Sequence, residues 1–347
     1  MFLRQVAFTI LLLILTGALL FAGGAAEGDD GEVVHVYSHR HYEADRQLYE
    51  DFTEETGIEV QVVEAGADEL IQRLSAEGES SPADVLITVD AGRLYRAQSM
   101  DLLQPVESSV LNDNVASHLR EEEGHWYGLT KRARIVAYHE DRVSADELSS
   151  YQALAEAQWE DRIAVRSSSN IYNISLLSAA VAHYGEDAAR DWAAGIVENM
   201  ARSPQGNDRD QLRAVAAGVA DIAIVNTYYI ALMRTSDDPE AREVGESVRV
   251  FFPNQDSTGT HVNVSGAGVT ASADNVAGAT RLLEFLTSRE AQQVFAQANH
   301  EYPIRDDVEP SDTVAAFGDF VEDSLPLSEF GANSRTATRI FDEVGWE

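Results

Sequence analysis

Residues 33–62 read VVHVYSHRHYEADRQLYEDFTEETGIEVQV, and this stretch sets two strand patterns around one helix pattern. It begins with a β-branched run and ends with the alternating run IEVQV, and both runs are typical of strands. Between them, Ala44, Leu48 and Phe52 stand at i, i+4 and i+8, which places them on one face of a helix. Gly57 follows as a suitable helix-ending residue. The stretch therefore predicts a strand–helix–strand unit.

The same alternation continues along the chain. Further β-branched runs occur at residues 84–89, 135–139, 162–165, 221–225, 248–252 and 268–270. Helical patterns lie between most of them, including 210–217 and the long stretch 276–296. This alternation predicts α/β domains with mainly parallel sheets. Because 347 residues usually exceed one compact domain and no clear linker is visible, we expect two domains that the chain crosses between more than once.

The N-terminus has the organisation of a secretory signal peptide. A basic start, MFLR, precedes an apolar run from Val6 to Phe21 and small residues up to Ala26. The apolar run has about 16 residues, fewer than the roughly 20 that a spanning helix needs. We therefore expect residues 1–26 to be a signal peptide and the mature protein to be periplasmic. An uncleaved membrane anchor is the alternative.

The composition excludes several classes of protein. Cysteine is absent, which excludes disulfides, thiolate metal sites and cysteine nucleophiles. Lysine and arginine number 25 against 59 acidic residues, and a net charge of −34 repels nucleic acid and anionic membranes. We interpret the acidity as an adaptation to saline surroundings, where salt screens self-repulsion. Steering of cations towards a site is a weaker explanation.

Tyrosine stands beside polar residues at three predicted strand ends. The segments are 37–42, 166–173 and 226–229, and they read YSHRHY, RSSSNIYN and NTYY. Ligands of open α/β sheets bind at the carboxyl ends of strands, so all three segments fall where a site would form.

Tyr228 and Tyr229 can reach one ligand only if the backbone turns there. On a continuing strand, these adjacent side chains would point to opposite faces. Asn226 and Thr227 are favourable helix N-caps, so we expect the pair to open a helix, where the side chains diverge by roughly 100°. Packing in an aromatic core or interface explains the pair equally well.

The other two segments also have ordinary explanations. A surface loop accounts for His41 and Tyr42, and simple packing accounts for Tyr172. Ser167 and Ser168 offer N–H groups at a helix N-terminus, where an anion can bind. An ordinary helix cap explains the same serines just as well.

The sequence lacks the common enzyme signatures. It contains no GxSxG elbow, no phosphate-binding loop of the Walker type and no HExxH. His118 and His125 flank Glu121–Glu123 and could bind a metal, although a solvated acidic turn is the better interpretation. We therefore do not expect an enzyme.

Taken together, the tyrosine segments resemble the ferric-ion-binding proteins of bacterial iron ABC importers, particularly their cyanobacterial-type, anion-independent branch. The most specific matching pieces are RHY at 40–42, GNDRDQ at 206–211 and NTYY at 226–229. Longer matching runs, such as GLTKRARIVAYH at 128–139, continue in order from Tyr37 to Val269. The resemblance implies an α/β, two-lobed periplasmic binding protein fold (type II, venus-flytrap) with the ligand cleft between the lobes.

The resemblance also implies the ligands of the iron. The family's iron-binding tyrosines would fall on Tyr42, Tyr172, Tyr228 and Tyr229, with His41 as a fifth ligand. Some relatives carry a glutamate in the segment that here reads TVD at 88–90. Its absence favours Tyr42 as the replacement and argues against Asp90 as a ligand.

In other relatives, a carbonate held by an arginine completes the coordination of the iron. Arg132 and Arg134 are the candidates here, and Arg134 is the preferred one. Ser167, Ser168 and Asn173 would lie beside the anion or behind the ligands. With four tyrosines the anion is dispensable, and Arg134 then pairs with a phenolate or braces the hinge.

The chemistry of ferric iron agrees with such a site. Fe³⁺ is a hard, highly charged cation that favours anionic oxygen ligands over neutral nitrogen. The pKa of free tyrosine is near 10, and a trivalent cation at bonding distance can displace the phenol proton at neutral pH. We therefore expect binding to release protons and to weaken as the pH falls.

The resemblance also sets the expected domain limits and partners. Lobe one would comprise residues 27–128 plus 259–303, and lobe two residues 129–258 plus 304–347, with hinge strands at 134–139 and 248–252. We expect a monomer that delivers ferric iron to the permease of an ABC transporter. The alternatives keep the fold but bind ferrous iron, another metal or an oxyanion, or serve as an extracytoplasmic iron sensor or enzyme.

Overall fold

The computed structural model describes residues 32–347, and Val33–Glu347 form one compact unit. The predicted signal peptide at 1–26 lies outside the described residues. Within residues 32–347, no helix combines the length and the apolar character that crossing a membrane requires.

Eight strands form the sheet, in the order β2-β1-β3-β8-β4-β6-β5, with β7 paired to β4 off this path. The strands are β1 (Val33–Ser38), β2 (Glu59–Glu64), β3 (Val85–Val89), β4 (Tyr127–Tyr138), β5 (Ile163–Ala164), β6 (Ile222–Asn226), β7 (Arg249–Phe251) and β8 (Val262–Val269). Every strand overlaps a run that the sequence predicts, so the predicted alternation of strands and helices is confirmed.

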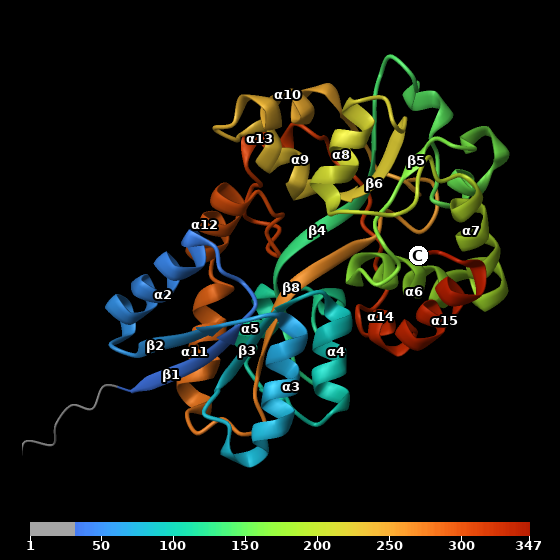
Figure 1. The fold of residues 1–347 in the computed structure, drawn as a ribbon. Coiled ribbons are helices and arrows are strands. Elements are labelled where there is room, and N and C mark those ends of the chain that lie inside the picture. The colour runs from blue at the N-terminus through green and yellow to red at the C-terminus, as the bar shows by residue number, and fades with distance from the viewer. Residues whose placement is uncertain (1–31) are drawn as a thin grey trace, which may run out of the picture. The chain divides into compact units, whose positions relative to one another are not determined.

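Strands β4 and β8 are longer than predicted and run antiparallel beside each other through the middle of the sheet (Figure 1). β8 also pairs antiparallel with β3, and β4 pairs antiparallel with β6 and β7. Among the described strands, only β1–β2, β1–β3 and β5–β6 are parallel. The prediction of mainly parallel sheets is therefore wrong, because local periodicity does not record the direction in which β4 and β8 cross the sheet.

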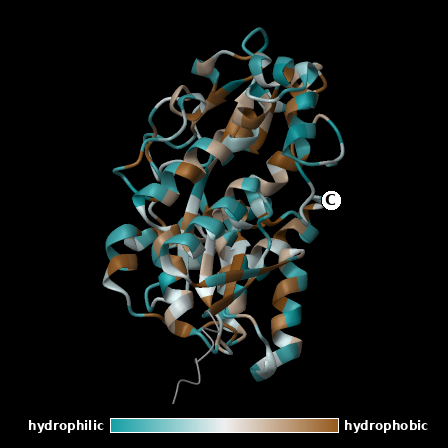
Figure 2. Cartoon of the chain, turned by 90° about the vertical axis from the view of Figure 1, so that its left-hand side faces the viewer, coloured by the Kyte–Doolittle hydropathy of each residue, from teal (hydrophilic) through white to brown (hydrophobic). Residues whose placement is uncertain are grey.

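Helices fill most connections between the strands. They are α2 (Glu43–Thr56), α3 (Ala67–Glu77), α4 (Ala91–Ser99), α5 (Ser109–Asn114), α6 (Ile171–Tyr184), α7 (Glu186–Glu198), α8 (Asp208–Ala216), α9 (Thr227–Arg234), α10 (Pro239–Ser247), α11 (Val276–Leu286), α12 (Arg289–Asn299), α13 (Asp312–Ala315), α14 (Ser328–Ala332) and α15 (Ser334–Val344). In Figure 2, hydrophilic and hydrophobic residues occur along the same helices, as expected for helices with one buried face.

The ends of two helices show how sequence sets their length. Helix α2 ends at Gly57, whose φ of 76° is accessible to glycine without a steric penalty. The predicted helical stretch 276–296 is instead two helices. The Ser288 hydroxyl accepts a hydrogen bond from the backbone N–H of Ala291, which caps α12 and separates it from α11.

Buried apolar side chains form three clusters. The first joins β1, β3 and β8 to helices that include α2, α4 and α11. The second lies among α6, α7 and α15, and the third among β4, α8 and α9. Ile222 and Ile224 of β6 belong to the second cluster, whereas Ala223 and Val225 belong to the third, because successive strand residues face opposite sides. The domain boundaries remain predictions.

Candidate metal site

Tyr228 and Tyr229 lie in the first turn of α9, as the sequence predicts. Asn226 is the N-cap residue, but its side chain does not cap the helix; it accepts a hydrogen bond from Arg134 Nη1 at 3.2 Å. The rings of Tyr228 and Tyr229 lie 4.2 Å apart between centroids, and Tyr228 is only 6 % exposed. The turn from β6 into α9 therefore brings both rings to the same place.

Tyr172 reaches the same place from another helix. It lies in the first turn of α6, where Asn170 Oδ1 accepts a hydrogen bond from the backbone N–H of Tyr172. The phenol oxygens of Tyr172 and Tyr228 are 3.3 Å apart, although 56 residues separate them in the chain. We call Tyr172, Tyr228 and Tyr229 the tyrosine trio.

His41 and Tyr42 form a separate part of the site at the start of α2. Tyr42 is the N-cap residue of α2 and is half-buried, whereas His41 is exposed. Their rings stack with centroids 5.6 Å apart, and His41 Nδ1 lies 3.3 Å from the carbonyl oxygen of His39. Tyr42 is near enough to Tyr172 and Tyr228 for the charge on one phenolate to affect the others.

Burial makes Tyr42, Tyr228 and Tyr229 harder to ionise than an ordinary phenol, because it raises the pKa of each. Burial, reinforced by the charge of Glu301, raises the pKa of Tyr42 to about 12. Burial and then the neighbouring tyrosines raise the pKa of Tyr228 well above its ordinary value, and the same two causes raise the pKa of Tyr229. A bound cation must therefore displace these protons.

Three arginines surround the ring of Tyr172. The guanidinium carbons of Arg132, Arg134 and Arg166 lie 5.6, 5.8 and 5.5 Å from its centroid. Their positive charge is placed to stabilise phenolates that form at the trio. A fourth arginine, Arg209, lies 5.4 Å from the ring centroid of Tyr229.

Arg134 is held by protein groups. Its Nη1 donates to Asp208 at 2.7 Å and its Nη2 donates to Asn173 Oδ1 at 2.9 Å. Asp208 is fully buried and also accepts from Arg166 and from the backbone N–H of Asn226. The carboxylate of Asp208 thus ties together the segments that carry the trio. Sequence reasoning missed Asp208 as a functional residue, and its only signal was its place in the GNDRDQ run.

Arg132 has hydrogen-bond donors without a partner among the described residues. It is 2 % exposed, and its Nη1 donates to Ser265 Oγ at 3.1 Å. Its Nε and Nη2 are buried without a hydrogen-bond partner among the described residues. An unpaired buried guanidinium edge is costly, so a ligand that accepts hydrogen bonds would be favoured there.

The predicted serines and Asn173 are engaged in the loop before α6. Asn173 Nδ2 donates to the backbone oxygens of Arg166 and Ser167. The Ser168 N–H donates to the backbone oxygen of Glu347, and Ser167 Oγ lies 3.0 Å from Ser169 Oγ. These contacts fix the loop that presents Tyr172.

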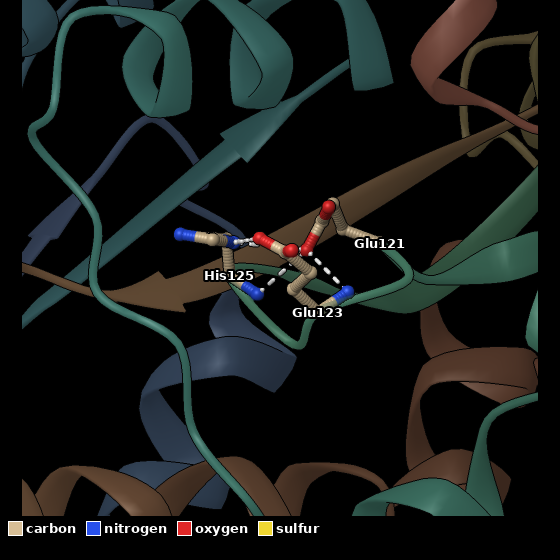
Figure 3. A group of neighbouring side chains, drawn as sticks. All are labelled: Glu121, Glu123 and His125. Atoms are coloured by element: carbon tan, nitrogen blue, oxygen red, sulfur yellow. Dashed lines mark hydrogen bonds and ion pairs between the residues drawn. The ribbon is translucent and has the colours of Figure 1, made fainter.

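The acidic turn that the sequence offered as a second metal site lies apart from these contacts. Glu121, Glu123 and His125 offer ligand atoms within 4.8 Å of one another (Figure 3). Glu121 Oε2 already accepts from the backbone N–H groups of Glu123 and His125, at 2.9 and 3.0 Å. The other histidine of this group, His118, lies 3.9 Å from Glu322 instead. The carboxylate of Glu121 therefore organises a turn.

Comparisons with known proteins connect this arrangement to iron. The family model for bacterial extracellular solute-binding proteins matches residues 47–320. Iron uptake protein A1 of Synechocystis is 48 % identical over 90 % of this chain and 87 % of its own length.

Two solved structures have the same fold. Trichodesmium FutA in complex with iron and citrate is 46 % identical, with a TM-score of 0.89 over 91 % of this chain and all of that one. The ferric binding protein from Campylobacter jejuni is 44 % identical, with a TM-score of 0.86 over 90 % of this chain and all of that one.

Proposed function

The chain belongs to the family of bacterial extracellular solute-binding proteins, and from this premise we propose that it captures ferric iron for an ABC importer. The iron ligands are the phenolates of Tyr42, Tyr172, Tyr228 and Tyr229, with His41 as the fifth ligand. The predicted α/β, two-lobed type II periplasmic binding fold is confirmed by the structural matches.

One observation carries the assignment of the site: the 3.3 Å between the phenol oxygens of Tyr172 and Tyr228. Two oxygens this close can bind one cation, and Tyr229 adjoins them through its ring contact with Tyr228. Packing alone does not require the polar tips of buried tyrosines to converge. The convergence supports a site for a hard cation.

The surroundings of the trio suit a trivalent ion. Fe³⁺ prefers anionic oxygen, and phenolates supply it once their protons are displaced. Four phenolates would exceed the charge of one ferric ion by one unit. The nearby guanidinium groups offset that excess. Several phenolates would also disfavour softer, less charged ions, which bind anionic oxygen less strongly.

Arg132 is the better candidate for holding an additional anion. Its unpaired Nε and Nη2 can donate to carbonate or to a carboxylate such as that of citrate, whereas the terminal nitrogens of Arg134 are occupied by Asp208 and Asn173. We therefore propose Arg132, and not Arg134, as the arginine that would hold the anion. Arg134 braces the loop of Tyr172 and the end of β6 instead.

The cellular setting follows from the family. A periplasmic monomer would bind the ion between its two lobes, which are residues 27–128 plus 259–303 and residues 129–258 plus 304–347. An ion that contacts both lobes favours the closed state. The closed protein would then deliver iron to the permease of the importer.

Visible spectroscopy tests the proposal. Loading the purified protein with ferric iron is expected to produce a phenolate-to-iron charge-transfer band, and Tyr228→Phe combined with Tyr229→Phe should abolish it. Tyr184→Phe is the matched control, because Tyr184 is 40 % exposed on a different part of α6. A colourless wild-type protein after ferric loading would contradict the proposal and favour ferrous iron, another cargo or a sensor or enzyme role.

A further inference from the structure

A buried ionic network lies directly beneath Tyr42. The side chain of Arg40 is 1 % exposed, and its Nε and Nη2 donate to Asp45 at 3.1 and 3.0 Å. Asp45 also accepts from the backbone N–H of Tyr42 at 3.4 Å. The guanidinium carbon of Arg40 lies 5.2 Å from the Tyr42 ring centroid and 5.1 Å from that of Phe295. Arg40 and Asp45 therefore hold Tyr42 through both its ring and its backbone.

Glu301 extends the network across the sheet. It follows α12, which packs beside α2 and near β4 (Figure 1). Its Oε2 accepts from Arg40 Nη1 at 2.9 Å, and its Oε1 accepts from Ser265 Oγ at 3.5 Å. Ser265 Oγ in turn accepts from Arg132 Nη1. A single buried carboxylate thus joins the arginine under Tyr42 to the arginine beside Tyr172.

The network is balanced in charge and closed to water. Arg40 and Arg132 are offset by Asp45 and Glu301, and all four residues are at most 5 % exposed. Separating two members of the network would leave buried charges without compensation, which is energetically costly. Each member is therefore held to a narrow range of positions. Such rigidity is what a metal site needs from the groups behind its ligands.

We infer that Arg40 and Glu301 are positioning residues of the iron site, which set Tyr42 at a fixed distance from the trio through Ser265 and Arg132. The inference rests on the proposed function. It adds that the affinity for iron depends on two residues that do not contact the ion.

The test removes the negative charge of Glu301 and keeps the shape of its side chain. Glu301→Gln is expected to weaken ferric affinity by up to about tenfold, the lower end of the range for groups behind metal ligands, because it acts through Tyr42 and cannot cost more than the loss of that phenolate. It should also shift the charge-transfer band, because the phenolate of Tyr42 would coordinate differently. Glu322→Gln is the matched control. Glu322 forms an ion pair with Lys131, which lies next to Arg132 in β4, but Glu322 is outside the network. It should change neither property.

Ser265→Ala keeps the test decisive if Glu301→Gln does not fold. It breaks the link between Glu301 and Arg132 without removing a charge, and it should produce a smaller change in the same direction. Unchanged affinity and an unchanged band in a folded Glu301→Gln or Ser265→Ala protein would overturn the inference. Failure of the proposed function looks different, because the wild-type protein would then show no band at all.

Discussion

The two parts of the candidate site differ in how far the protein has assembled them. Tyr172 and Tyr228 are 3.3 Å apart, and Asp208 fixes the segments beneath the trio. Tyr42 instead stacks on His41 and lies against the guanidinium of Arg40, and His41 is exposed. The oxygens of Tyr172 and Tyr228 are therefore already together in the free protein, whereas Tyr42 and His41 are the ligands that we propose complete the coordination of a bound cation. Four experiments test this difference.

The largest effect is expected from Asp208, on which the preorganised part depends. Asp208→Ala would leave the guanidinium groups of Arg134 and Arg166 without their shared buried partner. The free energy of unfolding should fall by about 3–5 kcal/mol, measured by denaturant titration. Asp68→Asn is the control, because the Asp68 side chain is 51 % exposed and its ion pairs with Arg93 and Arg96 should contribute at most about 1 kcal/mol. Equal losses in the two variants would contradict the role of Asp208.

The pH dependence of ferric affinity shows how many phenol protons are released on binding, and it therefore separates the contribution of Tyr42 from that of the trio. The pKa values of Tyr42, Tyr228 and Tyr229 are raised above that of an ordinary phenol, so these groups are protonated in the free protein at pH 5–8, and under the proposed function bound iron displaces the protons. Affinity should therefore fall as the pH falls, by about tenfold per phenol for each pH unit. Competition with a chelator of known proton affinity measures the slope. In Tyr42→Phe the slope should be smaller by one proton, and an unchanged slope would exclude Tyr42 as a ligand.

Single phenylalanine substitutions compare the two parts directly. Tyr172→Phe should lower ferric affinity by roughly 100-fold or more, because the preorganised oxygen pair is lost. Tyr42→Phe should cost about tenfold, since the trio still holds the ion. Absorbance titration with ferric iron gives both values. The opposite order would show that the start of α2, and not the trio, dominates binding.

The smallest effect is expected from His41. An exposed imidazole nitrogen is a poor ligand for a hard trivalent ion, so His41→Ala should lower affinity by less than about tenfold and leave most of the visible band. Complete loss of binding would mean that the histidine is essential and that the phenolates alone cannot retain iron.

Much of the fold could be predicted from local patterns. Helix α2 was predictable because Ala44, Leu48 and Phe52 share one face and Gly57 ends it. The full lengths of β4 and β8 were not predictable. These strands begin with the sequences YGLTKRAR and VNVSG, in which small or basic residues interrupt the β-branched pattern that is typical of a strand. The mixed direction of the sheet depends on contacts between residues far apart in sequence.

The tyrosines of the site could be predicted from their position after strands and from family resemblance, but the supporting network could not. Asp208 and Glu301 look like any of the 59 acidic residues of this chain until the fold buries them beside arginines. Arg132 and Arg134 lie two residues apart and look equivalent in sequence. Only their neighbours distinguish them. Asp208 and Asn173 occupy both terminal nitrogens of Arg134 and leave only its Nε unpaired, whereas Arg132 has both Nε and Nη2 without a partner among the described residues.

Anomalous scattering at the iron edge from crystals of the iron-loaded protein tests the central claim most directly. The account predicts one strong peak within bonding distance of the phenol oxygens of Tyr42, Tyr172, Tyr228 and Tyr229. A peak at the turn of Glu121, Glu123 and His125 with none at the tyrosines would contradict it.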